Sequence, residues 1–255
     1  MGHPRKNRNE PCCYHVTHRC QERRLLLKFQ KDRRRYLRRL REATGKYDVS
    51  VLDYIVTSNH VHLLFHAGSA TEVSGAMRYI QGNSARDYNL RKRREGAFWR
   101  GRYHPTMIQD GGHLSRCIFY IDMNMVRARK CTHPSGWAES GYHELTGKRH
   151  RYRIVDMGQL LKCLGHKGET EEFRKWYERT LEDYMSSNYH AREAIWSESL
   201  AIGSREWLLK LGKGIHGLEL KELDKSYFRT GENAALYSLT GSSRGKEAFW
   251  KKHQE

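Results

Sequence analysis

The chain contains 255 residues, of which 47 are Lys or Arg and 29 are Asp or Glu, so its formal net charge at pH 7 is +18. No stretch approaches the roughly 18 to 20 consecutive apolar residues of a membrane-spanning helix, and the N-terminus lacks the apolar segment of a secretory signal. We therefore expect a cytoplasmic protein with no membrane partner, and its hydrophobic fraction of 38% is sufficient for a folded core.

The positive charge is concentrated in the first part of the chain. Residues 1–150 hold 29 basic and 13 acidic side chains, a balance of +16, whereas residues 151–255 hold 18 and 16, a balance of +2. A field of this sign attracts a polyanion, because basic side chains release the counterions condensed on nucleic-acid phosphates. Nucleic acid is therefore the leading partner, and a basic surface that only aids solubility is the alternative.

The hydrophobic pattern predicts alternating strands and helices over the first half of the chain. In chain order the expected elements are a strand at 12–19, a helix at 32–44, strands at 46–57 and 60–66, a helix at 71–90, an extended segment within 97–109 and a helix at 113–129. Ser58 and Asn59 form the turn of an antiparallel hairpin. This order predicts an α+β fold of the ferredoxin-like kind, an antiparallel sheet with helices on its faces.

Beyond residue 150 the periodicity is helical. The expected helices are 157–164, 169–185, 191–200 and 204–211. We therefore predict two domains, with residues 151–255 forming a helical C-terminal accessory domain.

The six cysteines show no Cys-x-x-Cys pair and no regular spacing, which argues against a zinc ribbon. Without a secretory signal they are expected to be reduced thiols, most of them small core residues. They are Cys12, Cys13, Cys20, Cys117, Cys131 and Cys163.

The segment NHVHLLF at residues 59–65 places two histidines two residues apart on a predicted strand. Alternation sends Val61, Leu63 and Phe65 to one face, and His60 and His62 to the other, where two imidazoles can bind one divalent metal. Two exposed histidines on a sheet are the alternative, because a His-x-His sequence is short and frequent.

A second motif, YIDMN at residues 120–124, lies within a predicted helix. Its i, i+4 spacing puts Tyr120 and Asn124 one turn apart on the same face, so both can meet a single metal and substrate. The amide oxygen of Asn124 and two histidine nitrogens would leave positions on Mg²⁺ or Mn²⁺ open for a phosphate. Tyr120 is then the candidate nucleophile, helped by the metal because a free phenol has a pKa of about 10. A core tyrosine beside a surface asparagine is the alternative.

Together these motifs resemble those of the single-tyrosine HUH transposases, and more closely those of the REP-associated tyrosine transposases. The resemblance covers about residues 13–145. It rests on HVTHR at 15–19, SNHVHLLF at 58–65, GAFWRGRY at 96–103, YIDMNMVRA at 120–128 and WAESGY at 137–142. Met125 departs from the proline usual in that family, Cys20 from a glycine, and Thr57-Ser58 from Met-Pro. None of these is a metal ligand or the nucleophile.

The resemblance implies an HUH catalytic domain over residues 1–150. It matches His60 and His62 to the metal-binding histidines, Asn124 to the third metal-binding position and Tyr120 to the nucleophile. In the family, the tyrosine attacks a phosphate of single-stranded DNA, which leaves a 5′-phosphotyrosine link and a free 3′-hydroxyl. A REP-like hairpin is then the expected DNA partner, Mg²⁺ or Mn²⁺ the expected cofactor, and the nucleoid of a bacterial cytoplasm the expected location.

The sequence adds further expectations about partners. It contains no GxxxxGK[ST] phosphate loop, which agrees with a reaction that needs no nucleotide cofactor. We expect a monomer or a homodimer. Basic and aromatic residues beside the motifs are the candidates for contacting DNA phosphates and unpaired bases, although each has a structural alternative, such as core packing for Trp99 and an internal ion pair for Arg127. These candidates are Arg100, Arg102, Arg127, Trp99 and Tyr103.

Three functional hypotheses follow from the sequence. A DNA-cleaving and strand-transferring enzyme is the leading one. A catalytically retired protein that still binds hairpin DNA is the second, and an adaptor with a basic surface is the third. The arginine-rich segment from Arg33 to Arg41 is expected to hold the stem of a hairpin through its backbone, or only to solvate a helix face.

Overall fold

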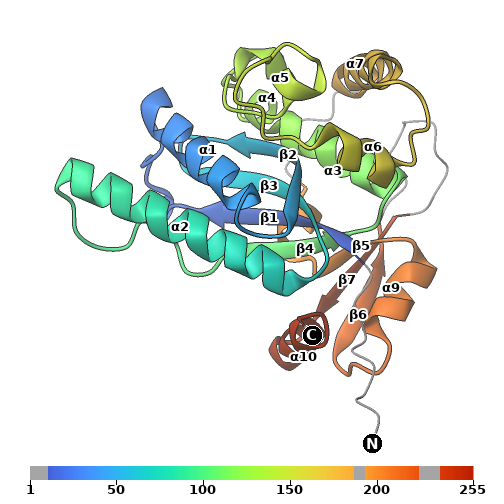
Figure 1. Ribbon diagram of the computed structural model, residues 1–255. Helices are drawn as coiled ribbons and strands as arrows, with labels where there is room; N and C mark the ends of the chain where they lie inside the picture. The colour runs from blue at the N-terminus through green and yellow to red at the C-terminus, as the bar shows by residue number, and fades with distance from the viewer. Residues whose placement is uncertain (1–10, 187–192, 224–235, 255) are drawn as a thin grey trace, which may run out of the picture.

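A computed structural model describes residues 11–186, 193–223 and 236–254 of the chain (Figure 1). Within these residues, seven strands form one sheet in the order β2-β3-β1-β4-β5-β7-β6. The first four strands pair with one another in antiparallel fashion, and their order confirms the predicted ferredoxin-like α+β fold. They are β1 (Cys12–Arg19), β2 (Val49–Val56), β3 (His60–Ala67) and β4 (His104–Ile108).

Helices and short helical turns connect these strands. The longest of them, α2, begins after Ser69, whose hydroxyl accepts a hydrogen bond from the backbone N–H of Glu72, and ends where Arg93 takes a left-handed conformation. No helix in the described parts of the chain is both long and apolar enough to cross a bilayer. Up to residue 145 these elements are η1 (Gln21–Arg23), α1 (Gln30–Thr44), α2 (Ala70–Lys92), α3 (Gly112–Asp122), α4 (Asn124–Arg127), η2 (Pro134–Gly136) and α5 (Tyr142–Leu145).

The helices cover the two faces of the four-stranded unit. On one face α1 packs beside α2, and Tyr36 of α1 meets Trp99, which stacks on His18 of β1. On the other face, Tyr120 of α3 contacts His15. His15 and His18 point to opposite faces because they are an odd number of residues apart on a strand. The sheet is therefore the middle layer of a three-layer arrangement.

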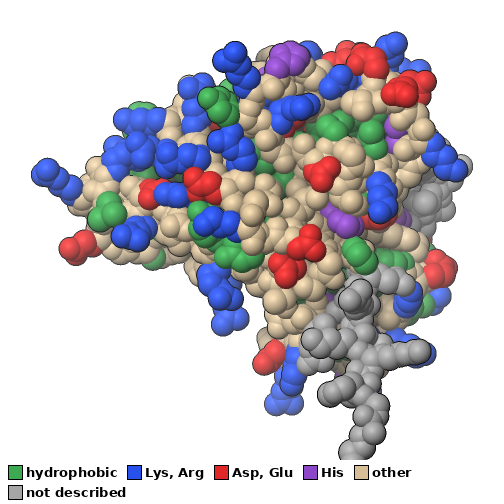
Figure 2. Space-filling model, viewed as in Figure 1, with side chains coloured by type: hydrophobic (Ala, Val, Ile, Leu, Met, Phe, Trp, Pro, Cys, Tyr) green, Lys and Arg blue, Asp and Glu red, His purple; other side chains and the backbone are tan. Residues whose placement is uncertain are grey.

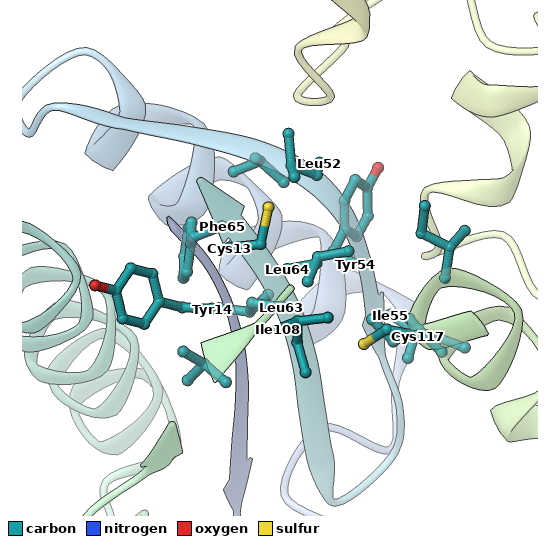
Figure 3. Packing of buried hydrophobic residues seen from close by; sticks show 14 of the residues in the cluster. Cys13, Tyr14, Leu52, Tyr54, Ile55, Leu63, Leu64, Phe65, Ile108 and Cys117 are labelled. Carbon is teal, nitrogen blue, oxygen red and sulfur yellow. The ribbon is translucent and has the colours of Figure 1, made fainter. Parts of the chain in front are cut away.

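Apolar side chains from the strands form the core between these layers. Figure 3 shows Tyr14, Leu63 and Phe65 packed together, and all three are buried. Burying a side chain of this size contributes roughly 1.5 to 3 kcal/mol to stability. This apolar set fixes which face of β3 points toward α1 and α2, and it leaves the opposite face for polar groups.

The region beyond residue 150 continues the same sheet. β5 pairs in parallel with β4, and the backbone N–H groups of Met107 and Gln109 donate to the carbonyls of Leu200 and Ile202 at 2.9 and 3.0 Å. Further along, β7 and β6 extend the edge. The elements here are α6 (Met157–Leu164), α7 (Thr170–Ser186), α8 (Ile195–Glu198), β5 (Ala201–Gly203), α9 (Arg205–Gly212), β6 (Leu218–Glu222), β7 (Tyr237–Gly241) and α10 (Ser243–Lys252).

The prediction of a purely helical C-terminal region is therefore wrong in part. The helices predicted at 157–164, 169–185 and 204–211 are present with small shifts. The helix predicted at 191–200 begins outside the described residues and is reduced to the single turn of α8 before β5 begins. Strands of three to five residues, which pair with partners far away in sequence, leave no periodic signal of their own. The division into two domains at residue 150 stays a prediction.

Two buried carboxyl groups lie where β2 meets the end of α3. Burial raises the pKa of Asp122 to about 7, and burial together with the proximity of Asp122 raises the pKa of Asp53 well above its usual value. The hydroxyl of Tyr177 in α7 donates to Asp122 Oδ2. Since α3 carries Tyr120 two residues earlier, this contact links the candidate nucleophile's helix to α7.

We predict that this carboxyl makes the protein less stable as pH rises. Asp122 keeps its proton in the folded state up to about pH 7, whereas the unfolded chain releases it near pH 4. Stability is therefore lost as pH rises from about 4 to 7, by roughly 2 to 3 kcal/mol between pH 5 and pH 8. Urea unfolding of Asp122→Asn should show a smaller loss over this range than the wild type. An equal loss in both proteins would contradict the assignment.

Candidate active site

Two histidines of β3 lie on the sheet face that α3 covers. Val61 and Leu63 are buried on the opposite face, while His60 is half-buried and His62 is 4% exposed. The ring centroids of His60 and His62 are 5.1 Å apart, with the ring planes at 78°. The structure therefore brings the two imidazoles of the His-x-His motif side by side, on a face that is polar at this end of the sheet.

The turn before β3 fixes the protonation of His60. Thr57 Oγ1 donates to the backbone carbonyl of His60 at 2.8 Å and accepts from its backbone N–H at 3.1 Å. The ring Nδ1 of His60 lies 2.9 Å from the same hydroxyl and 2.8 Å from Asn59 Oδ1. Because the hydroxyl proton is already used and the amide oxygen only accepts, Nδ1 carries the ring proton. The Nε2 of His60 therefore keeps its lone pair.

A second set of hydrogen bonds fixes the protonation of His62. The backbone carbonyl of Trp196 can only accept, so His15 Nδ1 donates to it, at 2.8 Å. His15 Nε2 then has a lone pair and accepts from His62 Nδ1 at 2.9 Å. His62 Nε2 is consequently unprotonated, like that of His60. The two histidines thus share one tautomer, in which Nε2 is the atom that can bind a metal.

Burial keeps the linked imidazoles neutral. It lowers the pKa of His15 to about 3. It also lowers the pKa of His62 well below its usual value, and the neighbouring His15, His60 and Arg127 act in the same direction. Neutral imidazole is the form that binds a metal ion. His62 is therefore in the metal-binding form throughout the physiological pH range.

Tyr120 and Asn124 come from two short helices instead of one continuous helix. α3 ends at Asp122, Met123 has φ −73° and ψ 0°, and α4 begins at Asn124. The one-turn relation survives the break: the ring of Tyr120 is 5.8 Å from that of His62, and Asn124 Nδ2 is 3.1 Å from His62 Nε2. A rotation of the Asn124 amide by half a turn would place its oxygen beside His62 Nε2 instead.

Arg127 and Trp196 hold the ring of Tyr120 from two directions. The ring is 3% exposed and stacks on Trp196 with centroids 5.6 Å apart. The guanidinium carbon of Arg127 lies 4.1 Å from the ring centroid, and Arg127 Nη2 donates to the backbone carbonyl of Tyr120 at 2.5 Å. A cation against the ring stabilises negative charge that develops on the phenol oxygen.

A cleft of about 470 Å³ is lined by His60, His62, Tyr120, Asn124 and Arg127. Its described lining contains one carboxylate, Glu198, against several cationic side chains, so the cleft favours an anionic ligand. The backbone conformation brings the arginines together: the Arg100 N–H donates to the carbonyl of Arg19 at 2.8 Å, next to Gly101 at φ +60°. The basic lining residues are Arg19, Arg23, Arg100, Arg102 and Arg127.

The five residues proposed from sequence to contact DNA divide into two groups. Arg100, Arg102 and Arg127 line the cleft. Trp99 and Tyr103 do not: Trp99 stacks on His18 and donates from Nε1 to the carbonyl of Gln81 at 3.2 Å, and the hydroxyl of Tyr103 bonds Ser74 at 2.8 Å. Both rings pack against α2, so the interpretation of Trp99 as a packing residue fits its position better than base stacking.

Sequence reasoning missed His15 and Trp196. Alternation along residues 12–19 places His15 and Thr17 on one face of the strand, and Thr17 pairs with His62. The register of that pairing is not visible in the sequence. Trp196 supplies a backbone carbonyl and a ring to the site from a segment 76 residues after Tyr120 in the chain. No local signal could have joined it to the motif.

The donor atoms at this site fit a divalent cation. His60 and His62 each offer an Nε2 nitrogen, and Asn124 offers an amide oxygen once its amide is rotated. All three lie on one side of a cleft that is large enough to admit a phosphate. Such a set leaves coordination positions for substrate oxygens. The choice of Mg²⁺ or Mn²⁺ stays a prediction.

Comparison with known proteins relates the first part of the chain to transposases. Residues 9–124 match the family model described as "Transposase IS200 like", a range that includes both motifs. This part of the chain is therefore similar to the IS200-like transposases. A comparison with curated proteins found no match.

Solved structures with a similar fold include two transposase-related proteins. One is a REP-associated tyrosine transposase bound to a REP hairpin, 17% identical, with a TM-score of 0.47 over 58% of this chain and 87% of that one. The other is a protein of Deinococcus radiodurans R1 described as a candidate transposase, 18% identical, with a TM-score of 0.33 over 41% of this chain and 84% of that one.

We predict that His15 sets the metal affinity of the site without touching the metal. His15→Ala removes the acceptor that holds His62 Nδ1–H, so the tautomer is no longer fixed and Mn²⁺ affinity should fall by roughly 10 to 100-fold. Titration followed by electron paramagnetic resonance measures this change. His104→Ala is the matched control, because His104 lines the same cleft but bonds the carbonyl of Ser199. Equal affinities for the wild type and His15→Ala would contradict the proposed role.

Proposed function

We propose that this protein is a transposase that cleaves and rejoins single-stranded DNA carrying a hairpin of the REP-like kind, with Tyr120 as nucleophile. The observation that carries the proposal is the meeting of Tyr120, the histidine pair His60 and His62, and Asn124 in one basic cleft. Each of these side chains, taken alone, is only weak evidence for a catalytic role. Their convergence from β3, α3 and α4 in one place is not expected for core or surface residues.

The chemistry follows from the groups present. The phenol oxygen of Tyr120 attacks the phosphorus, the bond to the 3′ oxygen breaks, and the phenol loses a proton while the 3′ oxygen gains one. The product is a 5′-phosphotyrosine link and a free 3′-hydroxyl, which can reverse the step on another strand. A divalent metal bound by His60, His62 and Asn124 would polarise the phosphate. The energy of the broken bond is kept in the new one, so no nucleotide cofactor is required.

The arginines of the cleft take different roles. Arg100 and Arg102 flank Gly101 in a turn beside the candidate ligands, and we assign them to the phosphates on either side of the cleaved bond. Arg127 is already engaged with the ring and carbonyl of Tyr120. It is therefore a positioning residue for the nucleophile, which replaces the phosphate contact expected from sequence.

The alternative is a protein that binds hairpin DNA but no longer cleaves it. Loss of catalysis usually leaves some catalytic group replaced or displaced. Here Tyr120, His60, His62 and Asn124 are all present and grouped, and the tautomer of both histidines is fixed for metal binding. A basic adaptor protein would have no reason to bury His62 beside His60 and a tyrosine. Both alternatives predict that no covalent adduct forms with DNA.

We predict that Tyr120→Phe abolishes cleavage and leaves DNA binding intact. The protein is mixed with single-stranded hairpin DNA from repeats that flank its own gene, with Mg²⁺ or Mn²⁺, and denaturing electrophoresis detects a covalent adduct. Wild type and the control Tyr103→Phe, whose hydroxyl lies outside the cleft, should form the adduct. Tyr120→Phe should form none, since no other hydroxyl replaces the nucleophile. An adduct with Tyr120→Phe, or with no divalent metal, would refute the mechanism.

We propose that a second basic surface holds the hairpin stem. Figure 2 shows Lys and Arg gathered over the part of the molecule that Figure 1 assigns to α1 and α2. A groove of about 470 Å³ runs here between α1 and residues 149–154, with Arg34, Arg38 and Arg41 on one side. Arg34 and Arg38 are 68% and 50% exposed in their side chains. Long exposed arginines of this kind contact duplex phosphates without reading sequence.

Arg33 does not belong to this surface, although the sequence grouped it with the others. Its guanidinium is buried, donates to Glu139 at 2.7 Å and packs 4.5 Å from the ring of Trp137. It therefore anchors α1 to the segment after η2. Arg39 is likewise structural, because it bonds Asp87 of α2 at 2.6 Å, whereas Arg34 and Arg38 face the solvent.

We predict that the arginines of the groove determine the salt dependence of hairpin binding. Replacing Arg34 and Arg38 by Ala should lower the slope of log K against log salt by about 1 for each phosphate that an arginine no longer neutralises, equally for hairpins of different sequence. Fluorescence anisotropy at several salt concentrations measures the slope. Arg205→Ala is the control, because this exposed arginine begins α9 at the other end of the sheet. An unchanged slope in the double variant would exclude the groove.

A further inference from the structure

A second cluster of metal-binding side chains lies on the same sheet face as the active site, at the other end of β1. Cys13 of β1, Asp110 just before α3 and Cys163 in α6 place one ligand atom each within 4.8 Å of one another. Both cysteines are buried, and Asp110 is exposed. These residues are 97 and 53 positions apart along the chain, so only the fold brings them together.

The hydrogen bonds in this cluster suit a thiolate pair. Cys13 Sγ donates to Asp110 Oδ1 at 3.1 Å, which brings the carboxylate within reach of the sulfur. The side-chain amide of Gln159, one turn earlier in α6, donates from Nε2 to Cys163 Sγ at 3.2 Å. An N–H donor on sulfur is the usual outer partner of a metal-bound thiolate, because it stabilises the negative charge.

The backbone around the cluster is fixed independently of these side chains. The N–H of Gly111 donates to the carbonyl of Cys163 at 2.9 Å, and Gly111 has φ +75°, a conformation that glycine adopts without strain. This contact joins the end of α6 to the residue that precedes α3. Cys13 pairs with Ile108, two residues before Asp110, so all three ligand residues are held in place before any ion binds, which lowers the entropic cost of binding.

We propose that Cys13, Cys163 and Asp110 bind one Zn²⁺ ion, with water in the fourth position at the exposed carboxylate. Two thiolates and one carboxylate are ligands that Zn²⁺ takes in tetrahedral sites, with sulfur at about 2.3 Å and oxygen at about 2.0 to 2.2 Å from the metal. A spread of ligand atoms below 4.8 Å agrees with such a tetrahedron. Thiolates are soft ligands that favour Zn²⁺ over the hard ions Mg²⁺ and Mn²⁺, so this site does not take up the ions expected at the histidine pair.

The ion would connect three parts of the fold. Cys13 belongs to the central strand, Asp110 to the link between β4 and α3, and Cys163 to the C-terminal region. It would fix the start of the helix that carries Tyr120 at its other end. This is a structural role, separate from the chemistry at the histidine pair, and it does not depend on the proposed DNA substrate.

Co²⁺ is the spectroscopic probe for this site in the reduced full-length protein. We expect a thiolate-to-cobalt charge-transfer band that Zn²⁺ abolishes, and a rise in Tm when Zn²⁺ is added. A histidine and amide site gives no thiolate band, so the two sites are distinguished. Cys13→Ser and Cys163→Ser should lose the band, whereas Cys131→Ser, which removes a half-buried cysteine elsewhere, should keep it.

A variant outside the core keeps the test decisive if the buried cysteine variants do not fold. Asp110→Asn changes an exposed side chain and retains both thiols, and it should raise the Kd for Co²⁺ by roughly 10-fold or more. No thiolate band in the reduced wild type would overturn the proposal. A band that Cys13→Ser and Cys163→Ser leave unchanged, or a Kd that Asp110→Asn does not alter, would overturn it as well.

Discussion

The antiparallel pairing of β1 with β3 is the constraint on which the rest of the site depends. Its register sets Thr17 opposite His62, so His15 lies diagonally across from His62 on the same face and can accept its Nδ1 proton. A slip of one residue would turn the histidines toward α1 and α2 and bring Leu63 to the polar side. The buried residues Leu63 and Phe65 oppose that slip, because it would cost their burial. Apolar packing on one face therefore holds the chemistry on the other.

The site places neutral nitrogen ligands among fixed cations. Burying a charged imidazole would be costly, and the low pKa values of His15 and His62 show that these rings are neutral when folded. Positive charge is supplied instead by arginines, which cannot be deprotonated in proteins. The positive field in the cleft therefore does not change with pH in the physiological range. An arrangement of this kind attracts a polyanion without protonating the imidazoles, so their lone pairs stay available to a metal ion.

The sequence was sufficient to predict the first four strands and the helices between them, and it singled out four candidate catalytic residues that the structure brings into one cleft, because those features have local patterns. The His-x-His alternation at His60 and the one-turn spacing from Tyr120 to Asn124 are both readable in short windows. The break at Met123 was not predicted, since nothing in the sequence there interrupts helical periodicity. The roles of His15, Trp196 and Cys163 depend on strand register and on contacts between distant segments. The engagement of Arg33 with Glu139 and of Arg127 with Tyr120 likewise follows from packing alone.

The carbonyl of Trp196, which accepts the Nδ1 proton of His15, lies outside the ferredoxin-like unit that carries the candidate catalytic residues. The ferredoxin-like unit is complete by residue 124, and a fragment ending near residue 150 would contain every residue with a catalytic assignment. In such a fragment His15 Nδ1 would face water, which both donates and accepts, and neither ring form of His15 or His62 would be selected. The proposed chemistry therefore depends on a segment beyond the ferredoxin-like unit, and gene fusions or exchanges that cut between β4 and α8 would separate the ligands from the group that sets their protonation.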